Sequence, residues 1–133
     1  MSAPSAAAGP RRRPRHREDV IQRHVVTWLR WVGPRLKAIW FHVPNGGGRS
    51  AIEAAIFKGL GVTAGAPDLV FLWGGGCACM EVKAEDGRLS PGQVAFREAC
   101  EQRGIPYAVV RNIDEAQTAV TGWGLIKPWE PGR

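Results

Sequence analysis

The spacing of apolar and polar residues predicts helices and strands that alternate along the chain. From Glu18, apolar residues recur at helical spacing until Gly33-Pro34 ends the run. Capping sequences predict two further helices, after Ser50-Ala-Ile-Glu53 and after Ser90-Pro-Gly-Gln93, and Asn112 is suited to cap a last one. Runs of large and branched residues predict strands over 36–43, 68–73, 77–84 and 106–111. The order αβαββαβα describes a small mixed α/β sandwich.

The composition fits one folded domain that carries a basic arm. The 133 residues are 44% hydrophobic and 23% charged, with a net charge of +6, which is typical of a single domain with its own core. The folded domain is expected over 18–122, and 123–133 is expected to be an irregular tail whose Trp123 and Trp129 either cover the sheet or form an interface. Residues 1–17 contain no acid, so we expect a disordered arm whose arginines attract DNA phosphates: Arg11, Arg12, Arg13, Arg15 and Arg17.

Cysteine usage and hydropathy favour a cytoplasmic protein. The three cysteines Cys77, Cys79 and Cys100 are an odd number and lack a fourth ligand for a structural zinc site, so they are expected to line the core or the site. No apolar run approaches the ~18 residues of a membrane span, and no leader sequence is recognisable. We expect no membrane partner, and the cytoplasm of a bacterial or phage-infected cell as the location.

Two neighbouring strands carry charged residues where the interior of a sheet is expected. In 77–84, alternation places apolar residues on one face and Glu81 and Lys83 on the other. In 68–73, alternation places Asp68 opposite the apolar face. An acid and a lysine within a sheet are costly unless they are paired or bind an ion.

The glycines between these strands decide whether the charged side chains meet. Directly opposed residues of a hairpin share a face, so Asp68 must pair with Glu81 or Lys83. A loop of all three glycines would pair Asp68 with Val82, on the wrong side. We therefore predict that one of the glycines 74–76 enters the ladder or forms a bulge, which leaves an even number of residues in the turn.

Two carboxylates that converge on one point predict a metal site. They repel each other when both are ionised, and a hard divalent cation offsets that repulsion. We expect Mg²⁺ or Mn²⁺ bound by Asp68, Glu81 and the backbone carbonyl of Val82. Lys83 would then orient a water or stabilise negative charge in the transition state. These groups suffice for metal-assisted hydrolysis of a phosphodiester.

These residues also carry a family resemblance. Pro67-Asp68 followed by Glu81-Val82-Lys83 resembles the PD-(D/E)xK nuclease signature, and an ordered series over 18–111 resembles the virus-type replication–repair nuclease (VRR-NUC) domain. The resemblance implies a PD-(D/E)xK restriction-endonuclease-like fold and a divalent-metal-dependent DNA nuclease built on Asp68, Glu81 and Lys83. The series comprises Glu18 and Gln22, His42-Val-Pro-Asn45-Gly, Gly65-Ala-Pro-Asp68, Glu81-Val-Lys83, Leu89-Ser-Pro-Gly-Gln93 and Gly104.

Five further residues each have two interpretations. Glu18 opens the core-facing stripe of its helix, where it either reaches the metal or stabilises the helix N-terminus. The resemblance implies a catalytic role for Gln93, whereas a capping box explains it without catalysis. Asn45 and Arg49 flank three glycines and either bind a DNA phosphate or belong to a plain connector. His42 is either a general base or DNA contact, or a structural residue.

We expect a metal-dependent DNA endonuclease that leaves a 5′-phosphate and a 3′-hydroxyl, as the resemblance implies. So small a chain has little surface for reading base sequence, which favours structure-selective cutting of branched or Holliday-junction-like DNA. A homodimer is expected, because two symmetric cuts need two active sites. Two alternatives remain open: a non-catalytic DNA-binding protein on the same fold, and a sequence-specific restriction-type endonuclease.

Overall fold

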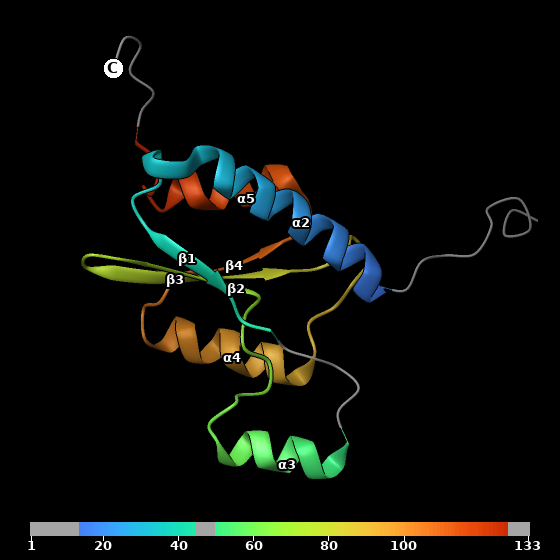
Figure 1. The fold of residues 1–133 in the computed structure, drawn as a ribbon. Helices are drawn as coiled ribbons and strands as arrows, with labels where there is room; N and C mark the ends of the chain where they lie inside the picture. Colours follow the sequence, from blue (N-terminus) through green and yellow to red (C-terminus); the bar gives the residue numbers. More distant parts are fainter. Residues whose placement is uncertain (1–13, 45–49, 128–133) are drawn as a thin grey trace, which may run out of the picture.

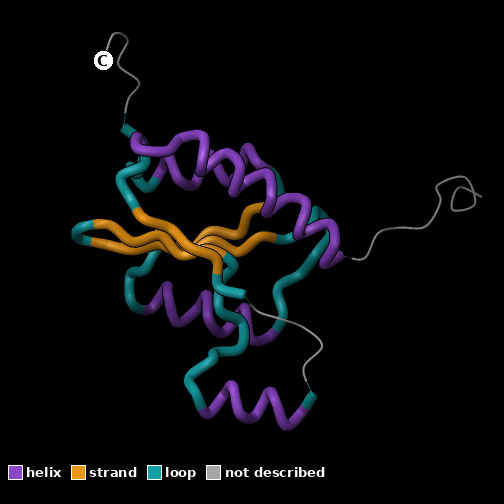
Figure 2. The backbone as a smooth tube through the Cα atoms, viewed as in Figure 1, coloured by secondary structure: helices purple, strands orange, loops and turns teal. Residues whose placement is uncertain are grey.

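A four-stranded mixed sheet with helices on both faces forms the centre of the protein (Figures 1 and 2). The computed structural model describes residues 14–44 and 50–127. The strand order is β1-β2-β3-β4; β1, β2 and β3 are antiparallel neighbours, and β4 runs parallel to β3. The elements are α2 (Pro14–Val32), the 3-10 helix η1 (Gly33–Arg35), β1 (Ile39–His42), α3 (Ala51–Gly59), β2 (Leu69–Trp73), β3 (Gly76–Val82), α4 (Pro91–Gln102), β4 (Tyr107–Val110) and α5 (Ile113–Gly122).

This arrangement confirms the mixed α/β class and the element order predicted from the sequence, with η1 as the one addition. α2 and α5 cover one face of the sheet, α4 lies on the other face, and α3 lies beyond α4 (Figure 1). Three predicted caps are present. Ser90 and Gln93 form a complete capping box at the start of α4, Ser50 caps α3, and Asn112 caps α5.

The first helix begins inside the segment that was expected to be a disordered arm. α2 starts at Pro14 rather than at Glu18, and proline is favourable in the first turn of a helix. Arg17 forms an ion pair with Asp86 at 2.7 Å, which joins this helix to the loop after β3. The helical part of the chain therefore includes Arg17. Residues 1–13, with Arg11, Arg12 and Arg13, lie outside the described residues.

The first strand is shorter than predicted, and its neighbouring segment pairs elsewhere. β1 spans Ile39–His42 instead of 36–43, because Leu36 forms an isolated antiparallel bridge with Ile126. The end of the chain, expected to be an irregular tail, thus contributes to the fold. Trp123 packs edge-on against Phe71, with 5.5 Å between the ring centroids. Trp123 covers the core, whereas Trp129 lies outside the described residues.

The core lies between the sheet and the pair α2 and α5, and the opposite face is only partly covered. Leu29 and Phe71 are among the buried side chains of this core. On the opposite face, Ile39, Phe41 and Leu72 remain 68%, 45% and 39% exposed, and α3 has no buried residue at all. Within the described part of the chain, no helix is both long and apolar enough to cross a membrane.

Candidate active site

The β2–β3 hairpin brings Asp68 and Glu81 to one side of the sheet. Trp73 pairs with Gly76, so this glycine belongs to the ladder and only residues 74–75 form the turn. Continuing the same register past the end of β2 sets Asp68 opposite Glu81. The predicted even number of turn residues is therefore confirmed, as is the shared face of the two acids.

Burial and the neighbouring Asp68 raise the pKa of the Glu81 carboxyl group. Glu81 is 2% exposed; burial, a hydrogen bond with Asp68 and the negative charge of Asp68 raise its pKa far above the ordinary value. The raised pKa favours the protonated form of Glu81, which can donate a hydrogen bond to Asp68. Asp68 in turn accepts a hydrogen bond from the backbone N–H of Val82 at 2.8 Å, which fixes its carboxylate beside β3.

The pair fits a divalent cation. The second oxygen of Glu81, Oε2, is buried and has no hydrogen-bond partner among the described residues. A cation would satisfy this oxygen and replace the proton that now offsets the repulsion. Among these residues, no group of three or more His, Cys, Asp and Glu side chains converges to hold a metal. Asp68 and Glu81 thus supply two ligands, and backbone oxygen and water, which Mg²⁺ commonly keeps, would supply the others.

Lys83 and Glu18 lie next to this pair. The Lys83 ammonium is 3.9 Å from the Glu18 carboxylate, and the Lys83 residue is 8% exposed. Burial raises the pKa of Glu18, while the charge of Lys83 opposes the increase. Because α2 begins at Pro14, Glu18 lies beyond the first helical turn, where the charge of a helix N-terminus has little effect. The alternative helix-terminal role of Glu18 is therefore not supported.

A hydrogen-bond chain holds Asp68 from the α2 side. His42 Nδ1 lies 2.7 Å from the Asp68 carbonyl oxygen and 2.9 Å from the side-chain amide of Gln22. In one tautomer Nδ1 donates to this carbonyl, and in the other it accepts from the Gln22 Nε2 amide. His42 thus joins α2, β1 and the start of β2. This contact supports the structural interpretation of His42.

Arg111 holds the loop that follows Lys83, and the sequence analysis did not identify it. Its guanidinium donates to the carbonyl oxygens of Ala84 and Gly87, both at 2.7 Å. β3 and β4 are parallel, so Arg111, which follows β4, lies beside the end of β3. The sequence shows only that Arg111 is a basic residue directly after a strand. Its role in holding the loop can be recognised only once the parallel pairing of β3 and β4 is known.

Of the remaining predicted site residues, the structure describes Gln93, Arg15 and Arg17 but not Asn45 and Arg49. Gln93 completes the capping box, because its side-chain oxygen accepts from the Ser90 N–H at 2.8 Å; a role in catalysis stays a prediction. Asn45 and Arg49 lie outside the described residues. Arg15 lies within α2, and Arg17 is engaged by an acid, as described above.

The loop before Asp68 is fixed by a close backbone approach. Gly65 has a φ of +78°, and a Cβ at this position would lie 2.2 Å from the carbonyl carbon of Gly92. Glycine is the one amino acid type that both adopts this φ readily and has no Cβ to clash with the Gly92 backbone. The start of α4 is therefore packed directly on the segment that leads to Asp68.

The model of the VRR-NUC domain family matches residues 12–112. A solved structure described as a VRR_NUC domain protein has a TM-score of 0.65 and 24% sequence identity, and the match covers 83% of this chain and 90% of that chain. At this identity the likeness concerns the fold. No curated protein matches the chain.

In metal-free buffer, Glu81→Gln is expected to stabilise the protein, and more so at higher pH. The folded-state pKa of Glu81 is raised, so wild-type stability falls as the pH rises above the unfolded-state pKa of about 4.5, by up to about 1.4 kcal/mol per pH unit. Glutamine can donate the same hydrogen bond and does not titrate. Urea unfolding at pH 5, 7 and 9 in EDTA measures the difference.

Two controls accompany this measurement. Glu98→Gln, at an exposed position of α4, should unfold like the wild type at each pH. Excess Mg²⁺ should stabilise the wild type more than Glu81→Gln, because only the wild type presents two carboxylates. A difference between wild type and Glu81→Gln that does not change with pH would contradict the raised pKa of Glu81.

Proposed function

This chain belongs to the VRR-NUC domain family, and on that premise we propose that it is a divalent-metal-dependent DNA endonuclease that hydrolyses phosphodiester bonds. Family membership implies a nuclease-type function in DNA processing. The observation that carries the finer proposal is the pair of half-buried Asp68 and buried Glu81, with one orphaned Glu81 oxygen, beside the buried Lys83. A protein that only binds DNA gains nothing from carboxylates that face phosphates.

The chain's own groups have distinct tasks in this proposal. Asp68, Glu81 and the carbonyl of Val82 would hold Mg²⁺ or Mn²⁺, and Glu81 gives up its proton in exchange. When bound, the cation lowers the pKa of a water and stabilises negative charge on the phosphate. Lys83, held near Glu18, donates hydrogen bonds to the attacking water or to a phosphate oxygen. The buried surroundings strengthen these interactions relative to water.

The proposed substrate is branched DNA, including junctions of the Holliday type, and the products carry a 5′-phosphate and a 3′-hydroxyl. The folded part is small, and within the described residues no separate unit is available for reading base sequence. Structure rather than sequence is therefore the feature that such a nuclease would select.

A homodimer completes the proposal, because two symmetric cuts in a junction require two active sites. The sheet face left open by α4 offers the surface for it. Ile39 and Phe41 on the edge strand β1 and Leu72 on its neighbour β2 are exposed there. Apolar side chains grouped in this way mark an interaction site more often than scattered ones do.

Asp68→Asn and Glu81→Gln should each lower the cleavage rate by about 10³-fold or more, because each removes a group that acts in the transition state. DNA affinity should change little, since the lost groups do not contact the phosphate backbone in the ground state. Linear duplex, single-stranded, flap and four-way-junction DNA are incubated with Mg²⁺, Mn²⁺ or EDTA, and the products are resolved on denaturing gels.

Asp19→Asn is the matched control, because Asp19 is an exposed neighbour of Glu18 on α2. It should cut like the wild type. Full cleavage by both carboxylate variants would refute the mechanism. Binding by the wild type without any metal-dependent product would favour a non-catalytic binder, and one discrete cut in linear duplex would favour a restriction-type enzyme.

Light scattering should give a mass in solution of twice the 14.5 kDa of the chain. Phe41→Ser is expected to weaken the dimer about tenfold or more, because it removes a large apolar side chain from the proposed interface. Trp31→Ser removes an aromatic residue that is 74% exposed on α2 and should leave the mass unchanged. A monomeric wild type at micromolar concentration would rule out this interface.

A further inference from the structure

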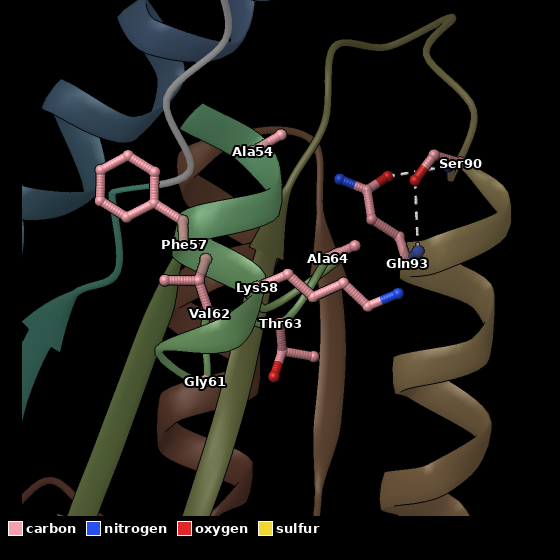
Figure 3. A pocket seen from close by; sticks show the side chains of 10 residues that line it. Ala54, Phe57, Lys58, Gly61, Val62, Thr63, Ala64, Ser90 and Gln93 are labelled. Atoms are coloured by element: carbon pink, nitrogen blue, oxygen red, sulfur yellow. Dashed lines mark hydrogen bonds between the residues drawn. The ribbon is translucent and has the colours of Figure 1, made fainter. Parts of the chain in front are cut away.

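A concave surface lies between α3 and the start of α4 (Figure 3). The cavity has a volume of about 790 Å³, within the range of pockets that hold small organic ligands. Neither the sequence motifs nor the family match assigns it a role. Its lining combines apolar and polar groups in a way that restricts the chemistry of an occupant.

The lining suits an anion attached to an apolar, planar group. Phe57 and Val62 supply apolar surface, and among the described lining residues Lys58 is the only charged side chain and there is no acid. Lys58 extends from α3 toward Gln93 in Figure 3. A lysine ammonium is a suitable point charge for a phosphate, and apolar or aromatic side chains contact bases regardless of sequence.

Gln93 adds a donor of defined orientation. Its oxygen accepts the Ser90 N–H at 2.8 Å, so the amide nitrogen is directed away from Ser90, as Figure 3 shows. This NH₂ group can therefore donate to an acceptor in the cavity. The capping box holds the amide in place, so the donor is oriented before any ligand binds.

The cavity is continuous with the chain segment that carries the candidate active site. Gly65 belongs to its lining, and Asp68 follows three residues later. The close packing of Gly65 on Gly92 prevents these parts from moving independently. A group bound in the cavity would thus have a fixed relation to Asp68.

We propose that this cavity binds an unpaired nucleotide of the DNA strand being cut, with its phosphate at Lys58 and its base against Phe57 and Val62. The inference rests on the proposed nuclease function and adds a substrate feature to it. A base inside a duplex cannot enter a concave cavity without leaving the stack, and that cost is smallest when the base is already unpaired. Flaps and branch points supply such bases.

The test fills the cavity and leaves the rest of α3 unchanged. Ala54 lines the cavity, whereas its neighbour Ala55 is exposed and does not. In EDTA, which prevents cleavage, wild-type protein is titrated into flap DNA with 2-aminopurine in the unpaired strand, and into a fully paired duplex with the same label. Ala54→Trp should weaken flap binding about fivefold or more and abolish the fluorescence change, and Ala55→Trp should do neither.

Lys58→Ala provides a second, smaller change. It should reduce the salt dependence of flap binding by about one phosphate contact, and Lys37→Ala, at an exposed position next to β1, should not. Flap binding by Ala54→Trp equal to that of the wild type would overturn the proposal. If Ala54→Trp does not fold, an unchanged salt dependence of Lys58→Ala overturns it instead.

This failure can be distinguished from failure of the nuclease proposal. Cleavage of flap DNA by wild type with Mg²⁺, together with unchanged binding by both cavity variants, rejects the nucleotide site alone. Absence of any metal-dependent cleavage by wild type rejects the nuclease function and with it the premise of this site.

Tyr107, the first residue of β4, has a buried hydroxyl group. Its hydroxyl oxygen and Glu81 Oε2 are two buried polar atoms without a hydrogen-bond partner among the described residues. In the parallel ladder Cys79 pairs with Tyr107 and Glu81 pairs with Val109, so Tyr107 and Glu81 lie on the same face of adjacent strands, two positions apart. After burial, the charge of Glu81 is the largest influence that raises the pKa of Tyr107.

We further infer that Tyr107 is a positioning residue that donates its hydroxyl hydrogen, through an ordered water, to Oε2 of Glu81. Buried polar atoms are rarely left unpaired, and buried waters usually bridge such atoms. The bridge would orient Glu81 toward Asp68 before a cation binds.

The chain contains a single tyrosine, so one isotope label reports on this contact alone. With ¹³Cζ-tyrosine, the NMR signal of the wild type should move on addition of Mg²⁺ and should already be displaced in Glu81→Gln. Glu98→Gln should keep the wild-type signal. Tyr107→Phe should lower kcat about tenfold with little change in KM, because it removes orientation and no substrate contact.

A tyrosine signal that responds neither to Mg²⁺ nor to Glu81→Gln would overturn this role, whatever the activity of Tyr107→Phe. An unchanged kcat in Tyr107→Phe would also overturn it, because the bridge would then have no effect on the reaction. The NMR signal does not depend on turnover, so this test is separate from that of the nuclease function.

Discussion

The structure depends on the placement of two carboxyl groups side by side, one of them, Glu81, almost fully buried and the other, Asp68, half-buried. Removing a carboxylate from water is costly, and a second one beside it adds repulsion. The fold meets this cost with a raised pKa of Glu81, which favours its protonated form, with the Val82 N–H that donates to Asp68, and with the nearby ammonium of Lys83. Without a function, an apolar pair at these positions would be the more stable choice. The free-energy cost of keeping the two carboxyl groups together therefore indicates that they serve a function.

Much of this site could be predicted from local patterns. Alternation along two strands gives the faces of Asp68 and Glu81, and the parity of the turn follows from requiring those faces to agree. The structure bears this out through the Trp73–Gly76 pair. The caps of the helices were also predictable, because capping depends on residues three apart in the sequence. These features share one property: each is decided within a few residues or within one hairpin.

What could not be predicted depends on contacts between distant segments. α2 begins at Pro14, and Arg17 in its first turn pairs with Asp86, which lies far along the chain. Arg111 acquires its role only when β4 lies parallel to β3. Tyr107 and Glu81 are related by that same pairing, and the sequence contains no sign of it. The exposure of α3 could not be predicted from the sequence either. Its apolar residues suggest a buried helix, but none of them is buried.

The two-residue turn at Gly74 and Gly75 also restricts how this hairpin can change in length. Losing or gaining one residue there, without a compensating bulge, would exchange the two faces of one strand and carry Asp68 to the far side of the sheet from Glu81. Losing or gaining two would merely shorten or extend the outer tip by one pair. Natural variation at this tip should therefore occur in even steps, and the far end of the hairpin can evolve freely while its base stays constant.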